Sequence, residues 1–129
     1  MTMSHVVLAV GLVVGVPGLA VAESNRDAEL ARDEVEFGII AAQHGLWDEA
    51  TFRFERAIAL DPEYAEAFND LAVAYEQTGR FDDAERMYQR ALAIDRGDPD
   101  IRTNYELFTE IVDRVGRPRV EAHSADSGW

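Results

Sequence analysis

The chain repeats its own pattern, because residues 45–61 and residues 79–95 match at a displacement of 34 positions. A fixed period of this length is typical of stacked supersecondary units, none of which can bury its apolar face alone. Such stacks usually serve as binding surfaces rather than as reaction centres. The matching pairs are Gly45/Gly79, Trp47/Phe81, Asp48/Asp82, Ala50/Ala84, Phe54/Tyr88, Arg56/Arg90, Ala57/Ala91, Ala59/Ala93 and Asp61/Asp95.

Within each unit the apolar residues have helical spacing. Ala50, Phe54 and Ala57 share one face of a predicted helix, and the second unit repeats this spacing. Another apolar segment with helical spacing precedes Gly45 and Gly79, and each glycine is expected to end that helix in a left-handed conformation. The sequence therefore predicts paired helices at residues 25–44, 48–60, 63–78 and 82–95.

At these positions the chain resembles the tetratricopeptide repeat family, whose unit is a 34-residue helix-turn-helix. The resemblance covers roughly half of the chain and implies an all-α solenoid with repeats at about 31–64 and 65–98. The chain departs from the family at Arg96, where proline is preferred, and at Glu34 and Ala41, where large residues are usual. A charged residue at Glu34 suits a terminal repeat, since one side of such a repeat faces solvent. The signature positions read Glu34, Phe37, Gly38, Ala41, Ala50, Phe54, Ala57 and Pro62, then Phe68, Leu71, Ala72, Tyr75, Ala84, Tyr88, Ala91 and Arg96.

Residues 99–115 are predicted to form a capping helix. Asp98 suits the N-cap and Pro99 the first helical position, where its missing N–H costs nothing. Apolar residues then recur every three or four positions until Gly116. This segment resembles the first helix of a third unit, which in the family covers the open end of the stack. Residues 117–129 show no periodicity, and we expect a flexible tail.

The amino-terminal segment has the layout of a secretory signal. Residues 6–22 form an uncharged apolar run with a break at Pro17 and small residues before Glu23. As a helix this run would be about 25 Å long, which is shorter than the ~30 Å hydrocarbon core of a membrane. We therefore predict a signal peptide at 1–22, cleaved after Ala22, and a mature domain at 23–116. Since residues 1–5 contain no Lys or Arg, an uncleaved N-terminal anchor remains the alternative.

Composition argues for a binding protein rather than an enzyme. The net charge of −13 disfavours nucleic acid, and the absence of cysteine excludes disulfides and thiolate chemistry. The sequence shows no phosphate-binding glycine loop, nucleophile elbow or His/Cys metal spacing. We expect no catalytic residue, cofactor or metal ion. The predicted location is the periplasm, with anchoring to the inner membrane, facing the periplasm, as the alternative.

The resemblance also implies where a partner binds, since the first helix of each unit lines a concave groove in the family. An apolar strip with acidic flanks suits a protein or peptide segment that has apolar anchors and basic flanks. A second interpretation is that part of the strip belongs to the core or is covered by the chain's own tail. The matching partner-binding positions are Val35, Ile39, Ala42, Glu66, Asn69, Val73 and Glu76.

Two functions follow from the resemblance. The first is a non-enzymatic protein–protein interaction module, an adaptor in an assembly process of the cell envelope. The second is a self-associating scaffold subunit of an envelope complex. Two units and a cap are fewer than the ~3 repeats that stable stacking usually requires, so an open end with Phe37, Trp47 and Phe52 could pair with another copy.

Overall fold

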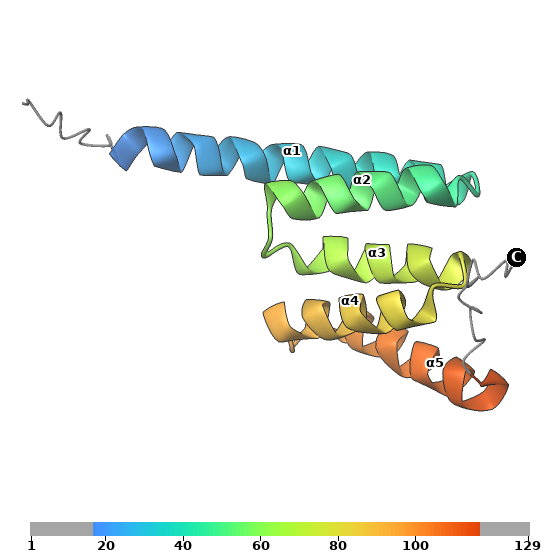
Figure 1. Ribbon diagram of the computed structural model, residues 1–129. Helices are drawn as coiled ribbons and strands as arrows, with labels where there is room; N and C mark the ends of the chain where they lie inside the picture. The colour runs from blue at the N-terminus through green and yellow to red at the C-terminus, as the bar shows by residue number, and fades with distance from the viewer. Residues whose placement is uncertain (1–16, 117–129) are drawn as a thin grey trace, which may run out of the picture.

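The computed structural model describes residues 17–116, and this part of the protein is entirely helical. Two antiparallel hairpins, α1–α2 and α3–α4, stack on each other, and α5 packs on the far side of α4 (Figure 1). The predicted all-α solenoid of two repeats and a capping helix is confirmed. The helices are α1 (Pro17–Gln43), α2 (Trp47–Leu60), α3 (Ala65–Gln77), α4 (Phe81–Ile94) and α5 (Pro99–Val115).

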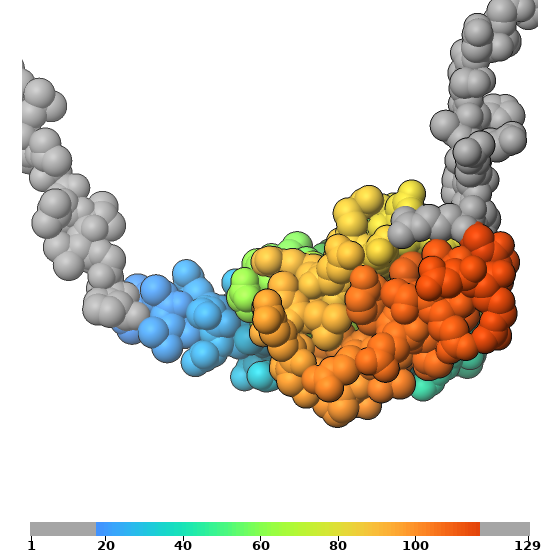
Figure 2. Space-filling model, turned by 90° about the horizontal axis from the view of Figure 1, so that it is seen from below, coloured from blue at the N-terminus to red at the C-terminus, as the bar shows by residue number. Residues whose placement is uncertain are grey.

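Helix α1 begins earlier than the sequence pattern indicated. Within the described residues it extends back to Pro17, whereas the pattern placed its start near residue 25. This amino-terminal part projects beyond the stack (Figures 1 and 2). Its side chains from Gly18 to Asp27 are all exposed, and Ala31 is the first buried residue of the helix. The rest of the predicted signal segment and the predicted tail lie outside the described residues.

Two glycines close the first helix of each repeat, as expected. Gly45 and Gly79 have φ angles of 72° and 76°, in the left-handed region where a β-carbon is strained. The following amide donates back into the helix in each case: Leu46 N to Ala41 O at 2.9 Å, and Arg80 N to Tyr75 O at 2.8 Å. This pair of tight turns sets the antiparallel direction of both hairpins.

The helices of each hairpin approach closely through small residues. Ala50 and Ala57 are fully buried, and Phe54 lies between them against α1. A β-carbon added at Gly38 would lie 2.4 Å from the ring of Phe54. Glycine at 38 is therefore required by the aromatic ring that fills this crossing, and Ala72 takes its place in the second repeat.

Arg56 of α2 and Arg90 of α4 occupy equivalent positions, but each contacts the first helix of its hairpin through a different interaction. Arg56 Nε donates to Glu34 at 2.9 Å, whereas the Arg90 guanidinium lies 5.8 Å from the ring centroid of Phe68. Glu34 also accepts from Arg53 at 3.2 Å. An ion pair in the first repeat thus replaces the cation–π contact of the second. The prediction that Glu34 faces solvent is wrong, because this carboxylate is largely buried between α1 and α2.

No helix within residues 17–116 combines the length and apolar character needed to cross a membrane.

Candidate functional site

The first helices of the units share one side of the stack, which we call the inner face. Helix α3 contacts both α1 and α5 directly across the hairpins. Their residues at a spacing of 34 positions include Ile39, Val73 and Leu107, one from each helix. Ile39 is 36% exposed, Val73 is half-buried and Leu107 is 53% exposed. We call these three equivalent apolar positions the apolar ladder.

The predicted partner-binding residues divide between surface and core. Glu66 is exposed on the inner face, and Ala42 and Glu76 are half-buried there. Val35, by contrast, is only 3% exposed and packs within the core, and Asn69 is buried as well. The accessible inner face is thus narrower than the strip predicted from the sequence, and Leu107 extends it onto α5.

A polar recess of about 340 Å³ lies beside the apolar ladder, between the amino-terminal parts of α3 and α5. A chain of hydrogen bonds joins the two helices at this point. Asn104 Nδ2 donates to Asn69 Oδ1 at 3.1 Å, and Asn69 Nδ2 donates to Asp70 Oδ1 at 3.3 Å. The recess is lined by Glu66, Asn69, Asp70, Asp98, Asp100 and Ile101.

Asp70 is the most perturbed carboxylate that the structure describes. The pKa of Asp70 is raised to about 7, first by burial and second by the charge of Glu66, while the hydrogen bond from Asn69 acts to lower it. Its Oδ2 atom is buried without a hydrogen-bond partner among residues 17–116. An ionised Asp70 is therefore compensated only by the hydrogen bond from Asn69 to Oδ1, and a cationic group from a partner would interact with Oδ2.

Glu76 has a different environment on the same helix. Tyr88 donates a hydrogen bond to the Glu76 carboxylate, and the centroid of the Tyr88 ring lies 5.4 Å from that of the Phe108 ring. Burial raises the pKa of Glu76, while the hydrogen bond from Tyr88 lowers it. This carboxylate is held by the core of the second repeat, so it has less freedom than Asp70 to contact a partner.

Comparison with known proteins agrees with this geometry. Residues 41–103 match the sequence family described as tetratricopeptide repeat. The chain carries tetratricopeptide repeats. Among solved structures it is similar to the tetratricopeptide repeat domain of OM64 from Arabidopsis, with a TM-score of 0.64 and 23% sequence identity over 68% of this chain and 73% of that chain. A search of the curated proteins finds no match.

The tetratricopeptide repeat fold is generally a protein–protein interaction module and typically has no enzymatic activity. No cluster of three or more His, Cys, Asp or Glu side chains in residues 17–116 has the geometry to hold a metal ion.

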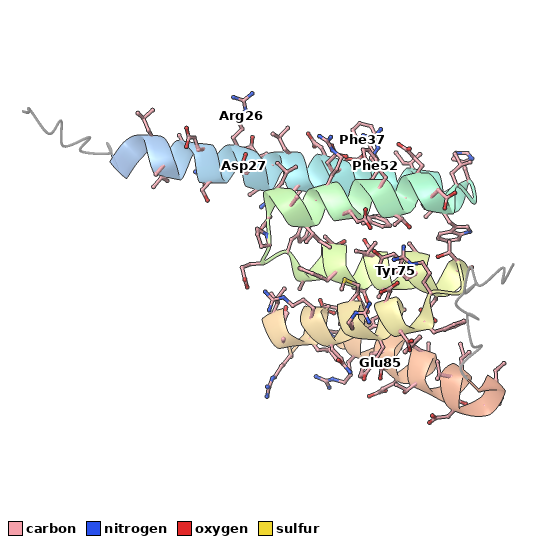
Figure 3. The ribbon with its side chains drawn as sticks, viewed as in Figure 1. Arg26, Asp27, Phe37, Phe52, Tyr75 and Glu85 are labelled. Atoms are coloured by element: carbon pink, nitrogen blue, oxygen red, sulfur yellow. The ribbon has the colours of Figure 1, made fainter. Side chains whose placement is uncertain are left out.

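The amino-terminal end of the tetratricopeptide stack presents a second apolar surface. Phe37 and Phe52 are exposed, and the guanidinium of Arg53 lies 5.7 Å and 5.8 Å from their ring centroids (Figure 3). Trp47, which the sequence grouped with them, packs against the core and lines a separate recess with Thr78. The open end is thus formed by the outer sides of α1 and α2.

Proposed function

We propose that the protein is a non-enzymatic adaptor that holds a peptide or protein segment on the inner face of its tetratricopeptide repeats. The observation that carries this proposal is the apolar ladder of Ile39, Val73 and Leu107 beside the carboxylate of Asp70, whose Oδ2 atom lacks a hydrogen-bond partner within residues 17–116. Apolar anchors give a partner buried area, and a charged contact fixes its register.

The spacing of the ladder suggests the form of the partner. Packed helices lie about 8–10 Å apart, so successive rungs are separated by roughly 10 Å. A segment in the polyproline II conformation has three residues per turn and rises about 3.1 Å per residue, so it would place an apolar residue on each rung at every third position. A helix would do so at every seventh position, because it rises 1.5 Å per residue.

The negative charge of the chain suggests which residues flank the apolar anchors of the partner. A basic side chain that entered the recess would neutralise Asp70 and replace its missing interaction. The net charge of −13 would also speed the encounter with a basic segment, and salt would slow it. We therefore propose a partner that combines apolar anchors with Arg or Lys.

Selection from a peptide-display library on the purified protein tests this function. The enriched sequences are expected to combine Arg or Lys with apolar residues at one of the two spacings, and a synthetic peptide of the enriched sequence then serves as the probe. Leu107→Asp should weaken its binding strongly while the fold is kept, because the side chain is 53% exposed. Val73→Asp should act in the same way at the centre of the ladder.

Arg86→Ala is the matched control, since Arg86 is an exposed residue of α4 that pairs only locally with Asp83. It should leave peptide binding unchanged. If both ladder variants fold and bind the peptide as well as the parent, recognition does not use the inner face and the proposal fails.

For the location of the protein, we propose export to the periplasm and removal of residues 1–22. Removal after Ala22 would leave the core intact, because the described side chains before residue 28 are exposed. The helix would then begin at Glu23, where an acidic residue is favourable. The uninterrupted helix from Pro17 equally suits the alternative, an uncleaved anchor that continues into α1 and holds the repeats at the inner membrane.

Within the envelope, we propose that the adaptor serves an assembly process, a role that rests on the family resemblance. A scaffold subunit that associates with itself is the alternative function, and the exposed rings of Phe37 and Phe52 favour it. Affinity capture from an envelope extract, with the parent and Leu107→Asp as parallel baits, would separate these functions. Proteins retained by the parent and lost by the variant would support the adaptor.

A further inference from the structure

The amino-terminal end of the stack is built like a surface that another helix covers. Phe37 and Ile40 of α1 correspond, 34 positions on, to Leu71 and Ala74 of α3. Helix α2 covers α3, and Leu71 is 3% exposed, whereas Phe37 is 56% exposed. The same repeat position is thus buried in the second hairpin and exposed to solvent in the first.

At the opposite end of the stack, the outer side of α5 is polar within residues 17–116. Helix α5 forms this end of the stack (Figure 2), and Arg102, Glu106 and Asp113 of this helix are exposed. The counterparts of the first two, 34 positions earlier, are the buried residues Phe68 and Ala72. The exposed apolar residues of α5, Leu107, Ile111 and Val115, lie on a different side of the helix from these polar residues. Head-to-tail stacking of copies through the outer side of α5 would therefore leave the apolar side of α1 against charges.

The outer side of α1 carries an ordered stripe of charged and apolar residues. Arg26, Leu30, Asp33 and Phe37 follow one another at spacings of four, three and four, and therefore lie on one side of the helix. Arg26 and Phe37 both project away from the stack (Figure 3). Leu30 is exposed, and neither Arg26 nor Asp33 forms an ion pair within residues 17–116.

We propose that a second copy of this chain covers this stripe, with the two α1 helices antiparallel about a two-fold axis near Leu30. Arg26 and Asp33 are equally distant from the midpoint between them, so the axis places Arg26 of each copy beside Asp33 of the other. Because the two-fold axis repeats every contact, the pairing of Arg26 with Asp33 occurs twice in the dimer, as in any isologous interface. Leu30 meets Leu30 of the second copy at the axis.

The charges select this direction. A parallel pair of α1 helices would place Arg26 beside Arg26 and Asp33 beside Asp33, and like charges at this distance repel. In the antiparallel pair, Glu23 of the second copy approaches Phe37, whose ring lies under the Arg53 guanidinium. The two ion pairs and the Leu30 contact lie within residues 23–36, so they form with or without residues 1–22, and they leave the inner face free for the proposed partner.

The test is the mass of the full chain in solution, measured by light scattering over a range of concentrations. The parent should be a dimer. Arg26→Asp and Asp33→Arg should each raise the dimer dissociation constant at least about tenfold. Each substitution would place two like charges beside each other at both symmetry-related contacts of the dimer. The double variant, with both charges exchanged, should restore the dimer, and an equimolar mixture of the two single variants should form a mixed dimer.

Both positions are exposed, and circular dichroism melts should show that the variants remain folded. A parent that is monomeric at every concentration would overturn the proposal. So would single variants that dimerise like the parent, which is also the result expected if copies associate through residues 1–22 or another surface. Failure of the double variant to restore the dimer would exclude the antiparallel register.

Discussion

Asp70→Asn should make the folded protein more stable at neutral and higher pH. A carboxyl group whose pKa rises from 3.8 to about 7 on folding destabilises the ionised folded state by about 4 kcal/mol. This penalty is absent below the unfolded pKa, grows as the pH rises from about 4 to 7, and is complete above 7. Asparagine removes the penalty but leaves a buried amide without an acceptor, at a cost of about 1–3 kcal/mol that does not depend on pH.

Denaturant unfolding followed by circular dichroism at pH 5 and pH 8 measures this effect. The stability of Asp70→Asn relative to the parent should increase by about 2–3 kcal/mol between these two values, whatever the cost of the amide. Asp113→Asn makes the same chemical change at an exposed position of α5 and should alter stability by less than about 0.5 kcal/mol at both. If the difference between Asp70→Asn and the parent is the same at pH 5 and pH 8, the carboxylate is hydrated in the folded state and the reasoning fails.

Three further predictions concern packing and processing. Ala84→Leu should lower the unfolding free energy by about 1–3 kcal/mol, because Ala84 is fully buried where α3 and α4 meet, and an unchanged denaturant midpoint would contradict this. Gly38→Ala should destabilise by a similar amount, since its methyl group would overlap the Phe54 ring, and Phe54→Leu in the same chain should recover part of the loss. The intact mass of the protein from its native host should correspond to a chain that begins at Glu23; a mass that retains Met1, found in the membrane fraction, would favour the anchor.

The repeat fold was predictable because its determinants are local and occur twice. Gly45 and Gly79 end a helix by their own backbone preference, and Asp98 and Pro99 begin one by theirs, so no tertiary information was needed. The start of α1 was predicted about eight residues late, because the apolar segment was interpreted by its resemblance to a signal sequence. Helix propensity and targeting function are independent, and one segment can satisfy both.

The candidate site was less predictable, and the reasons differ between residues. Adding 34 to Val73 gives Leu107, and the resemblance of residues 99–115 to the first helix of a third unit was the signal that could have identified it. The burial of Val35 depends on how closely α1 approaches its neighbours, which periodicity alone does not define. The pKa of Asp70 depends on its burial, on the charge of Glu66 and on the hydrogen bond from Asn69, and these three occur together only in the folded structure.

Asp70 and Glu76 show how a cost in stability can indicate function. Glu76 accepts a hydrogen bond from Tyr88, so the fold compensates its partial burial. Asp70 has an unpartnered oxygen, and a penalty of about 4 kcal/mol is a large share of the 5–15 kcal/mol that stabilises a typical domain. A basic side chain in the recess would bind the ionised form of Asp70 and thereby lower its pKa. We therefore expect the affinity for a basic segment to rise as the pH increases from 6 to 8, and Asp70→Asn to abolish this rise while it stabilises the free protein.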